Sequence, residues 1–209
     1  DVHLYNNTFV DAPAAFERNE RSKTRDHFGW HPATGPEVDE REGHVFVNNL
    51  LVAGAAFTRP LLRFEQPAAL CETLTRPMAN EVNGNVYVRA WPGGSDAEPP
   101  LIVISPVANE SCFATFTSLD ALRKFMPAFE TAGQQLDRTP RSIFMAPDLG
   151  RYELLQSIGA LPGAPTLPAH VREALGWNTA ESQTADGRNQ APADSAGRVG
   201  AYGHHPAVP

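Results

Sequence analysis

The stretch VHLYNNTFV at residues 2–10 and its counterpart HVFVNNLLV at residues 44–52 decide the fold that we predict for this chain. In each, β-branched and aromatic residues that favour strands flank a pair of asparagines. Asparagine tolerates left-handed backbone angles, and stacked asparagine side chains can hydrogen-bond in a ladder. The pattern is typical of the coils of an all-β solenoid, with structural corner residues at Asn6, Asn7, Asn48, Asn49, Asn83 and Asn85.

The composition of the 209 residues is that of a globular protein, with 42% hydrophobic and 20% charged residues. One core with a tail is expected at this length. The net charge of -7 argues against a general nucleic-acid binder, which needs a positive surface. No apolar run reaches the roughly 18 residues that would span a bilayer. We therefore expect no nucleic-acid partner and no transmembrane segment.

Strand-like runs recur through the first half of the chain, at residues 44–54, 60–66, 82–91 and 101–105. Ser118 is a plausible N-cap for a helix at residues 118–125, and a second helix is expected at residues 168–175. We assign residues 1–155 to β-helix coils with an insertion at 12–43 and the helix near 118–125. Residues 156–209 are assigned to a C-terminal helix and an irregular tail that packs on the solenoid.

Two features bear on assembly and location. The first residues already have a strand pattern, which predicts an unpaired edge that an upstream segment or another chain would cap. Cys71 and Cys112 fit either one disulfide in an oxidising compartment or two buried thiols.

Further motifs follow in a fixed order along the chain. NGNVYVR at residues 83–89 is similar to a "D-x-N-x-Y-x-R" strand. SIFMAPD at 142–148 with YEL at 152–154 looks like a "D-P-x-F … Y-x-L" closing segment, and DGR at 186–188 with GAY at 200–202 is similar to a "D-x-x-G-x-x-R … D-I-G-A-x-E" tail. With the Asn-Asn stretches and the helix at 118–125, these motifs resemble the C-terminal part of right-handed parallel β-helix repeat proteins of the pectate-lyase-like superfamily. The resemblance implies a right-handed parallel β-helix and, in many relatives, secreted, periplasmic or cell-surface proteins that act on polysaccharides.

The insertion carries the residues that could supply chemistry. A polysaccharide lyase needs a base beside the uronate carboxylate and a cation that neutralises it. His27 and His31 could supply the base, and Arg25 and Arg41 the neutralising charge. Trp30 offers a flat face for a sugar ring, and Lys23 is a further candidate for substrate binding. The structural alternative is that the charged residues pair with one another while Phe28 and Trp30 anchor the loop, and we expect residues 25–44 to be ordered with Trp30 largely buried.

Carboxylates give two other interpretations. Glu37, Asp39 and Glu40 could bind Ca²⁺, which prefers several hard oxygens, although a solvated acidic surface also explains them. A glycoside hydrolase would need two carboxylates about 5 to 10 Å apart, which adjacent coils can provide. Asp11 with Asp26 or Glu37 is available for such a pair.

Two functions follow from these patterns. The first is an extracytoplasmic polysaccharide-active protein of the lyase or glycoside hydrolase type. The second is a non-catalytic surface, adhesin-like or assembly protein that uses its strands as a rigid body and the insertion as a contact surface.

Overall fold

The strands of the first half of the chain fall into groups of three, which we call strand triplets. The computed structural model describes residues 1–18, 41–91, 97–155 and 165–174. The first triplet is β1 (His3–Tyr5), β2 (Thr8–Val10) and β3 (Ala14–Glu17), and the second is β4 (His44–Val47), β5 (Leu50–Ala53) and β6 (Leu62–Glu65). The third is β7 (Ala79–Asn83), β8 (Val86–Arg89) and β9 (Ile102–Ile104).

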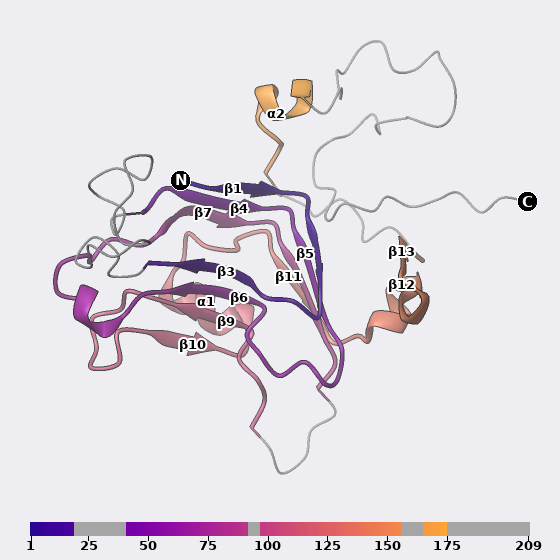
Figure 1. Cartoon of the computed structure of the whole chain (residues 1–209), viewed down its shortest axis with the longest axis horizontal. Helices are drawn as coiled ribbons and strands as arrows, with labels where there is room; N and C mark the ends of the chain where they lie inside the picture. Colours follow the sequence, from indigo (N-terminus) through magenta and orange to yellow (C-terminus); the bar gives the residue numbers. More distant parts are fainter. Residues whose placement is uncertain (19–40, 92–96, 156–164, 175–209) are drawn as a thin grey trace, which may run out of the picture.

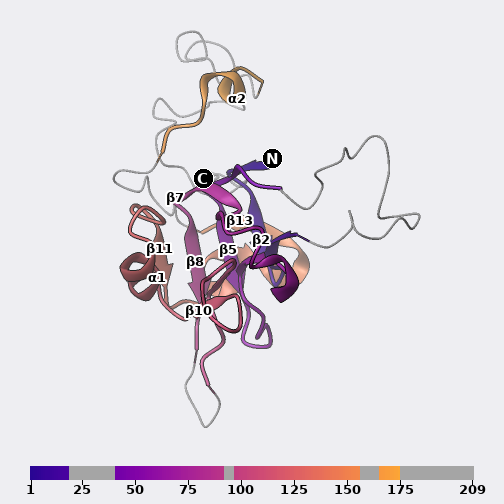
Figure 2. The same ribbon diagram turned by 90° about the vertical axis from the view of Figure 1, so that its left-hand side faces the viewer.

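Each triplet gives one strand to each of three sheets (Figure 1). Sheet A has the order β1-β4-β7, and all its pairs are parallel. Sheet B has the order β11-β8-β5-β2, also parallel, with β11 at Gln134–Leu136; Figure 2 shows these four strands side by side. Sheet C has the order β10-β9-β6-β3, in which β10 (Ala114–Phe116) pairs antiparallel with β9.

The predicted fold class, an all-β right-handed parallel β-helix, is wrong. No solenoid is found in the described part of the chain, which forms several separate parallel sheets with about 34% strand and some helix. After the third triplet, β10 pairs antiparallel with β9 and is followed by a helix, so the chain does not continue with uniform parallel coils. The helical elements are α1 (Leu119–Phe125), α2 (Ala169–Ala174) and the short 3-10 helices Ala68–Leu70, Pro140–Ser142 and Pro147–Leu149.

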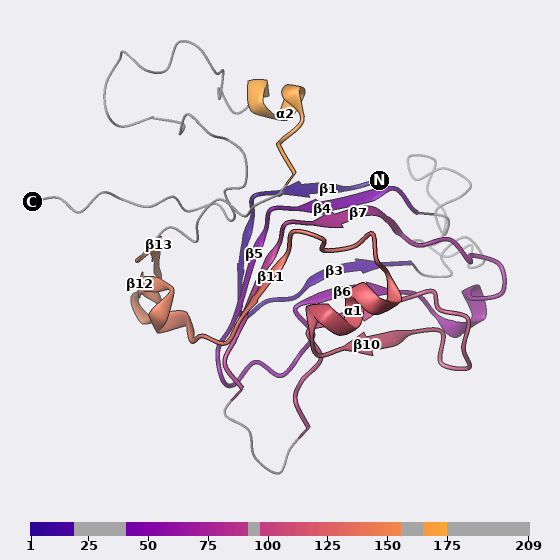
Figure 3. The same cartoon turned by 180° about the vertical axis from the view of Figure 1, so that it is seen from behind.

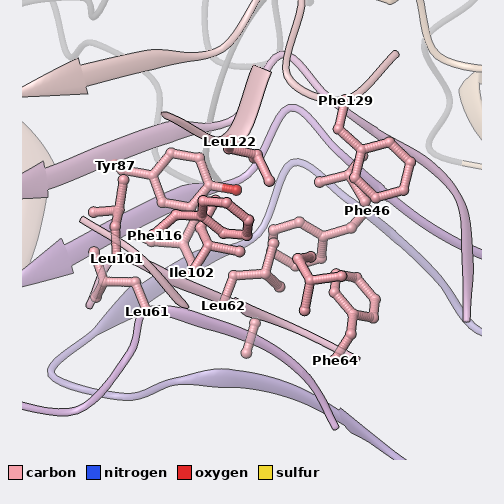
Figure 4. Packing of buried hydrophobic residues seen from close by; sticks show 14 of the residues in the cluster. Phe46, Leu61, Leu62, Phe64, Tyr87, Leu101, Ile102, Phe116, Leu122 and Phe129 are labelled. Carbon is pink, nitrogen blue, oxygen red and sulfur yellow. The ribbon is translucent and has the colours of Figure 1, made fainter. Parts of the chain in front are cut away.

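The main core lies between the three sheets. Parallel register places residues of successive triplets directly beside one another, so apolar side chains form columns. The columns are Leu4, Phe46 and Val82 in sheet A; Phe9, Leu51 and Tyr87 in sheet B; and Phe16, Phe64 and Ile104 in sheet C. The rings of Phe16 and Phe64 stack with centroids 4.8 Å apart. Figure 4 shows how densely the buried side chains fill this space.

Sheet B is covered on its outer face as well. The antiparallel pair β12 (Phe144–Ala146) and β13 (Arg151–Leu154) lies beyond the sheet in Figure 1. Phe144 and Leu154 pack there against the outward-facing residues Leu50, Val52, Val86 and Val88. Burial on both faces explains why β5 has an unbroken apolar sequence.

Helix α1 closes one end of the core. The Ser118 side chain accepts a hydrogen bond from the Ala121 amide at 3.2 Å, which confirms the predicted N-cap. Leu119 and Leu122 are buried in the main core, whereas Phe125 is half exposed. Figure 3 shows α1 in front of the strands near β10, and Figure 2 shows it beside β11, on the side away from β2.

The asparagine corners are as predicted in the first two triplets, whereas in the third Asn83 ends β7 and Gly84 takes the left-handed angle. Asn6 and Asn48 have left-handed φ angles of 54° and 57°. In the ladder, Asn7 Nδ2 donates to Asn49 Oδ1 at 3.1 Å, and Asn49 Nδ2 donates to Asn85 Oδ1 at 3.0 Å. The side chains of Asn49 and Asn85 are fully buried, so these hydrogen bonds satisfy polar groups that have no access to water.

Cys71 and Cys112 form a disulfide with Cα atoms 6.1 Å apart. It connects the segment after β6 with the segment before β10. Of the two alternatives from the sequence, a disulfide or two buried thiols, the structure has the disulfide. None of the helices in the described ranges is long and apolar enough to cross a bilayer.

Candidate functional site

The buried Arg18 holds together the two ends of the segment 19–40. Its side chain is only 1% exposed. Nε donates to the main-chain oxygen of Arg41 at 2.9 Å, and Nη1 donates to Gln66 Oε1 at 2.8 Å and to the main-chain oxygen of Arg76 at 3.0 Å. The guanidinium has several donors in a rigid plane, which suits this fixed set of acceptors. We call this group the Arg18 clamp.

Glu42 supplies the counter-charge for the clamp. Its Oε2 lies 3.6 Å from Arg18 Nη2, and its Oε1 lies 3.2 Å from Arg76 Nη1. A buried guanidinium needs such a partner because an unpaired charge inside a protein is costly. The Arg76 side chain is 79% exposed, so its own ion pair contributes little to stability.

His44 lies beside the clamp as a neutral structural residue. Its Nδ1 accepts the Val2 amide at 3.0 Å, and its ring packs on Phe16 with centroids 4.9 Å apart. Burial lowers the pKa of His44, and the nearby positive charges of the N-terminal amine, Arg18, Arg41 and His3 lower it further. In the described contacts, His44 acts as a hydrogen-bond acceptor for the main chain and not as a base for a substrate.

Two carboxylates lie next to the clamp on the outer face of sheet C. Glu17 of β3 and Glu65 of β6 are partners in the parallel register. Arg63 lies between them, with Nη2 2.8 Å from Glu17 Oε1 and Nη1 3.1 Å from Glu65 Oε2. The Glu17 and Glu65 side chains are 55% and 37% exposed, so a ligand in solution can reach this group. We call Glu17, Arg63 and Glu65 the sheet C triad.

The sequence did not single out this triad. Glu17 lies 46 residues before Arg63 in the chain, and the pairing of β3 with β6 brings the two together. Strand β3 also lies within the range 12–43 that the sequence assigns to an insertion. In AAFE, the buried Ala14 and Phe16 alternate with the exposed Ala15 and Glu17. This short alternation is the sequence signal for the strand.

Most of the predicted site residues lie outside the described residues, namely Lys23, Arg25, His27, Trp30, His31, Glu37, Asp39 and Glu40. Arg41 is described: it is exposed, and its main-chain oxygen belongs to the clamp. Asp11, which was considered for a carboxylate pair, instead accepts the Gly54 amide at 2.6 Å in a turn where its own φ is 48°. Its possible partners Asp26 and Glu37 are not described.

Calcium binding stays a prediction. Within the described ranges, no group of three or more His, Cys, Asp or Glu residues could hold a metal ion.

Glu130 is the most perturbed carboxyl group of the described residues. Its Oε1 accepts from Tyr87 Oη at 2.6 Å and from Asn85 Nδ2 at 2.7 Å, and its Oε2 accepts from the Asn85 amide at 3.2 Å. Burial raises the pKa of Glu130 to about 7, while these hydrogen bonds and the charge of Arg123 oppose the rise. Perturbed carboxyls often mark functional sites, but Glu130 is fully buried and contacts no open surface. It therefore ends the asparagine ladder and is a structural residue.

No family model matches the chain, and neither the curated proteins nor the solved structures contain a match to it. The function must therefore be argued from the residues themselves.

Proposed function

We propose that the protein is an extracytoplasmic, polysaccharide-active protein whose site is the sheet C triad together with the adjoining segment 19–40. The observation that carries the proposal is the position of the Arg18 clamp. It ties Arg41 to Arg18, which follows Glu17 in the chain, and the sequence between Arg18 and Arg41 carries His27, Trp30 and His31. The resemblance to pectate-lyase-like proteins supports the same class of substrate.

The triad supports a hydrolytic reaction. The Arg63 guanidinium contacts both carboxyl groups, so Glu17 and Glu65 lie close together, and retaining glycosidases use such a close pair, with the two carboxyl groups ~5 Å apart. In this proposal, Glu17 and Glu65 act as the nucleophile and the general acid. Arg63, which contacts both carboxylates, is the positive group that a sugar carboxylate would approach, and this favours an acidic polysaccharide as the substrate.

The disulfide supports the proposed location. Disulfides persist in oxidising compartments and are rare in the cytosol, so Cys71–Cys112 fits a secreted, periplasmic or cell-surface protein.

The test is a panel of polysaccharides that includes polygalacturonate, alginate and a neutral glucan. We expect new reducing ends without the ultraviolet absorbance of unsaturated ends. Glu17→Gln and Glu65→Gln should each lower the rate by about 100-fold or more, because a positioned acid or base contributes that much. Glu81→Gln, an exposed carboxylate of sheet A, is the matched control and should retain the rate.

Other results decide against this reaction. Unsaturated ends that disappear in His27→Ala or His31→Ala would show a lyase that uses the segment 19–40 instead. The absence of any product from every polysaccharide would remove the enzymatic proposal.

A second candidate is an assembly role, which the edge positions of β1, β2 and β3 in the described sheets favour. These strands are the last members of their sheets in the described chain, and an unpaired edge can bind another strand. An upstream segment or another chain would be the partner. Light scattering of the native material tests this role, since a stable monomer counts against it.

A further inference from the structure

The outer face of sheet C continues beyond the sheet C triad. In Figure 1 its strands follow one another in the order β3, β6, β9 and β10. Ile102 and Ile104 of β9 and Phe116 of β10 are buried in the main core. Because successive residues of a strand point to opposite faces, the residues that alternate with them belong to the outer face. The outer face therefore runs from the triad on β3 and β6 across to β10.

The register places Thr115 in the same row as Arg63. Arg63 of β6 pairs with Val103 of β9, and Val103 pairs with Thr115 of β10. Phe113 lies two residues before Thr115, so it belongs to the same face. Both Thr115 and Phe113 are exposed, Phe113 at 45%. At the usual strand spacing β10 is roughly 10 Å from β6, so an extended molecule that crosses the strands can contact the triad and Phe113 together.

The backbone on both sides of Phe113 is fixed. Cys112, which has a left-handed φ of 65°, is joined to Cys71 by the disulfide. The main-chain oxygen of Phe113 accepts from Asn109 Nδ2 at 3.0 Å and from Ser111 Oγ at 3.2 Å. A rigid backbone limits the entropy that a side chain loses when it binds a ligand. The fold therefore presents an aromatic ring to solvent in a defined place.

The surroundings of Phe113 suit a sugar better than a protein or a membrane, which would need a contiguous apolar patch. Phe113 shares its face with the charged triad and with Thr115. The other exposed large apolar side chains of the described residues lie on other elements, at Val2, Phe125, Met145, Leu149 and Leu155. A sugar ring has one apolar C–H face and a rim of hydroxyls, which matches one aromatic ring among polar groups.

We propose that Phe113 and Thr115 form a second sugar-binding subsite for the polysaccharide that binds at the sheet C triad. One sugar ring packs its apolar face on the Phe113 ring, and the Thr115 hydroxyl hydrogen-bonds a hydroxyl of the same sugar. A sugar ring in a polysaccharide is about as long as one strand spacing, so this sugar lies about two rings from the triad. The inference deepens the proposed function and rests on it, because both concern the same substrate.

The experiment measures KM and kcat of full-chain variants on the polysaccharide that the wild type cleaves fastest. Phe113→Ala should raise KM about threefold to tenfold, the range that one aromatic contact contributes, with kcat changed by less than about twofold. Phe113→Tyr should keep the wild-type KM because it keeps the ring, whereas Phe113→Leu should resemble Phe113→Ala. Phe125→Ala is the matched control and should leave KM unchanged, since Phe125 is 50% exposed but lies at the end of α1.

The outcomes separate the subsite from the proposed function. An unchanged KM in Phe113→Ala, or a wild-type KM in Phe113→Leu as well as in Phe113→Tyr, overturns the inference while the proposed function stands. The thermal unfolding temperature of Phe113→Ala should stay within about 2 °C of the wild type. A larger fall would show that the ring serves the fold and would also overturn the inference. A wild type that cleaves no polysaccharide overturns the proposed function, and the inference falls with it.

Discussion

Replacement of Glu130 by Gln should change how stability depends on pH. The carboxyl has its ordinary pKa of 4.5 in the unfolded chain and a pKa of about 7 when it is buried in the folded protein. Between these values the folded state binds the proton more tightly than the unfolded state. The contribution of Glu130 is therefore fully present below pH 4.5 and is lost as the pH rises through about 7.

The size of this effect follows from the two pKa values. A tenfold difference in proton affinity corresponds to about 1.4 kcal/mol. The rise from 4.5 to about 7 then corresponds to about 3 kcal/mol of unfolding free energy. Burial is the largest cause, since the Tyr87 and Asn85 hydrogen bonds lower the pKa.

Urea unfolding followed by circular dichroism at several pH values measures the effect. His44 contributes a slope of the opposite sign, because its lowered pKa makes the folded protein more stable as the pH rises toward 6.5. The quantity to compare is therefore the unfolding free energy of the wild type minus that of Glu130→Gln. The contribution of His44 is the same in both proteins and cancels in this difference. We expect this difference to fall by about 3 kcal/mol between pH 4.5 and about pH 8.

Glu72→Gln, at an exposed position, is the control for the loss of a carboxylate and should change the unfolding free energy by less than about 0.5 kcal/mol. If the difference for Glu130→Gln rises with pH instead, the ladder donors hold the carboxylate ionised. The dominance of burial is then refuted.

Three further changes test the structure. Asn49→Ala removes the middle of the buried ladder and should lower the free energy of urea unfolding by about 3 kcal/mol. Asn80→Ala, at an exposed position, is the control and should lower it by less than about 0.5 kcal/mol. Equal effects of the two substitutions would contradict the ladder. Arg18→Ala leaves several buried acceptors without a donor, so it should lower the unfolding free energy by about 2–4 kcal/mol. Trypsin should also cleave faster within residues 19–40. Unchanged stability and cleavage would contradict the clamp. The Cys71–Cys112 disulfide joins residues 41 apart in the sequence, so its reduction should lower the unfolding free energy by about 4 kcal/mol. A mass that shows two free thiols before reduction would contradict the bond.

The local features of the fold could be predicted because neighbouring residues determine them. The corners at Asn6 and Asn48 follow from the tolerance of asparagine for positive φ. The helix at Leu119–Phe125 follows from its N-cap and its apolar spacing. The arrangement of whole sheets does not follow in this way, because the same corners are compatible with more than one arrangement, and the predicted solenoid was wrong.

Residues that act over long separations escaped the prediction. Glu130 lies 45 residues from Asn85, and its role depends on Gly133, where a Cβ would overlap Glu130 Oε2. Arg18 reaches Arg76 across 58 residues. No local pattern marks either contact. Arg41 was a predicted site residue, and the structure shows only that its main-chain oxygen belongs to the clamp, whereas Glu17 and Glu65 were not chosen from the sequence.

The proposed site is tested most directly by a nuclear magnetic resonance titration of the full chain with oligogalacturonate, with a neutral cello-oligosaccharide as the comparison. The account predicts saturable shifts for the acidic sugar at Glu17, Arg63 and Glu65, with a further change at Arg41. Saturation of shifts elsewhere, with these four amides unchanged, would contradict it, as would equal responses to the acidic and the neutral sugar.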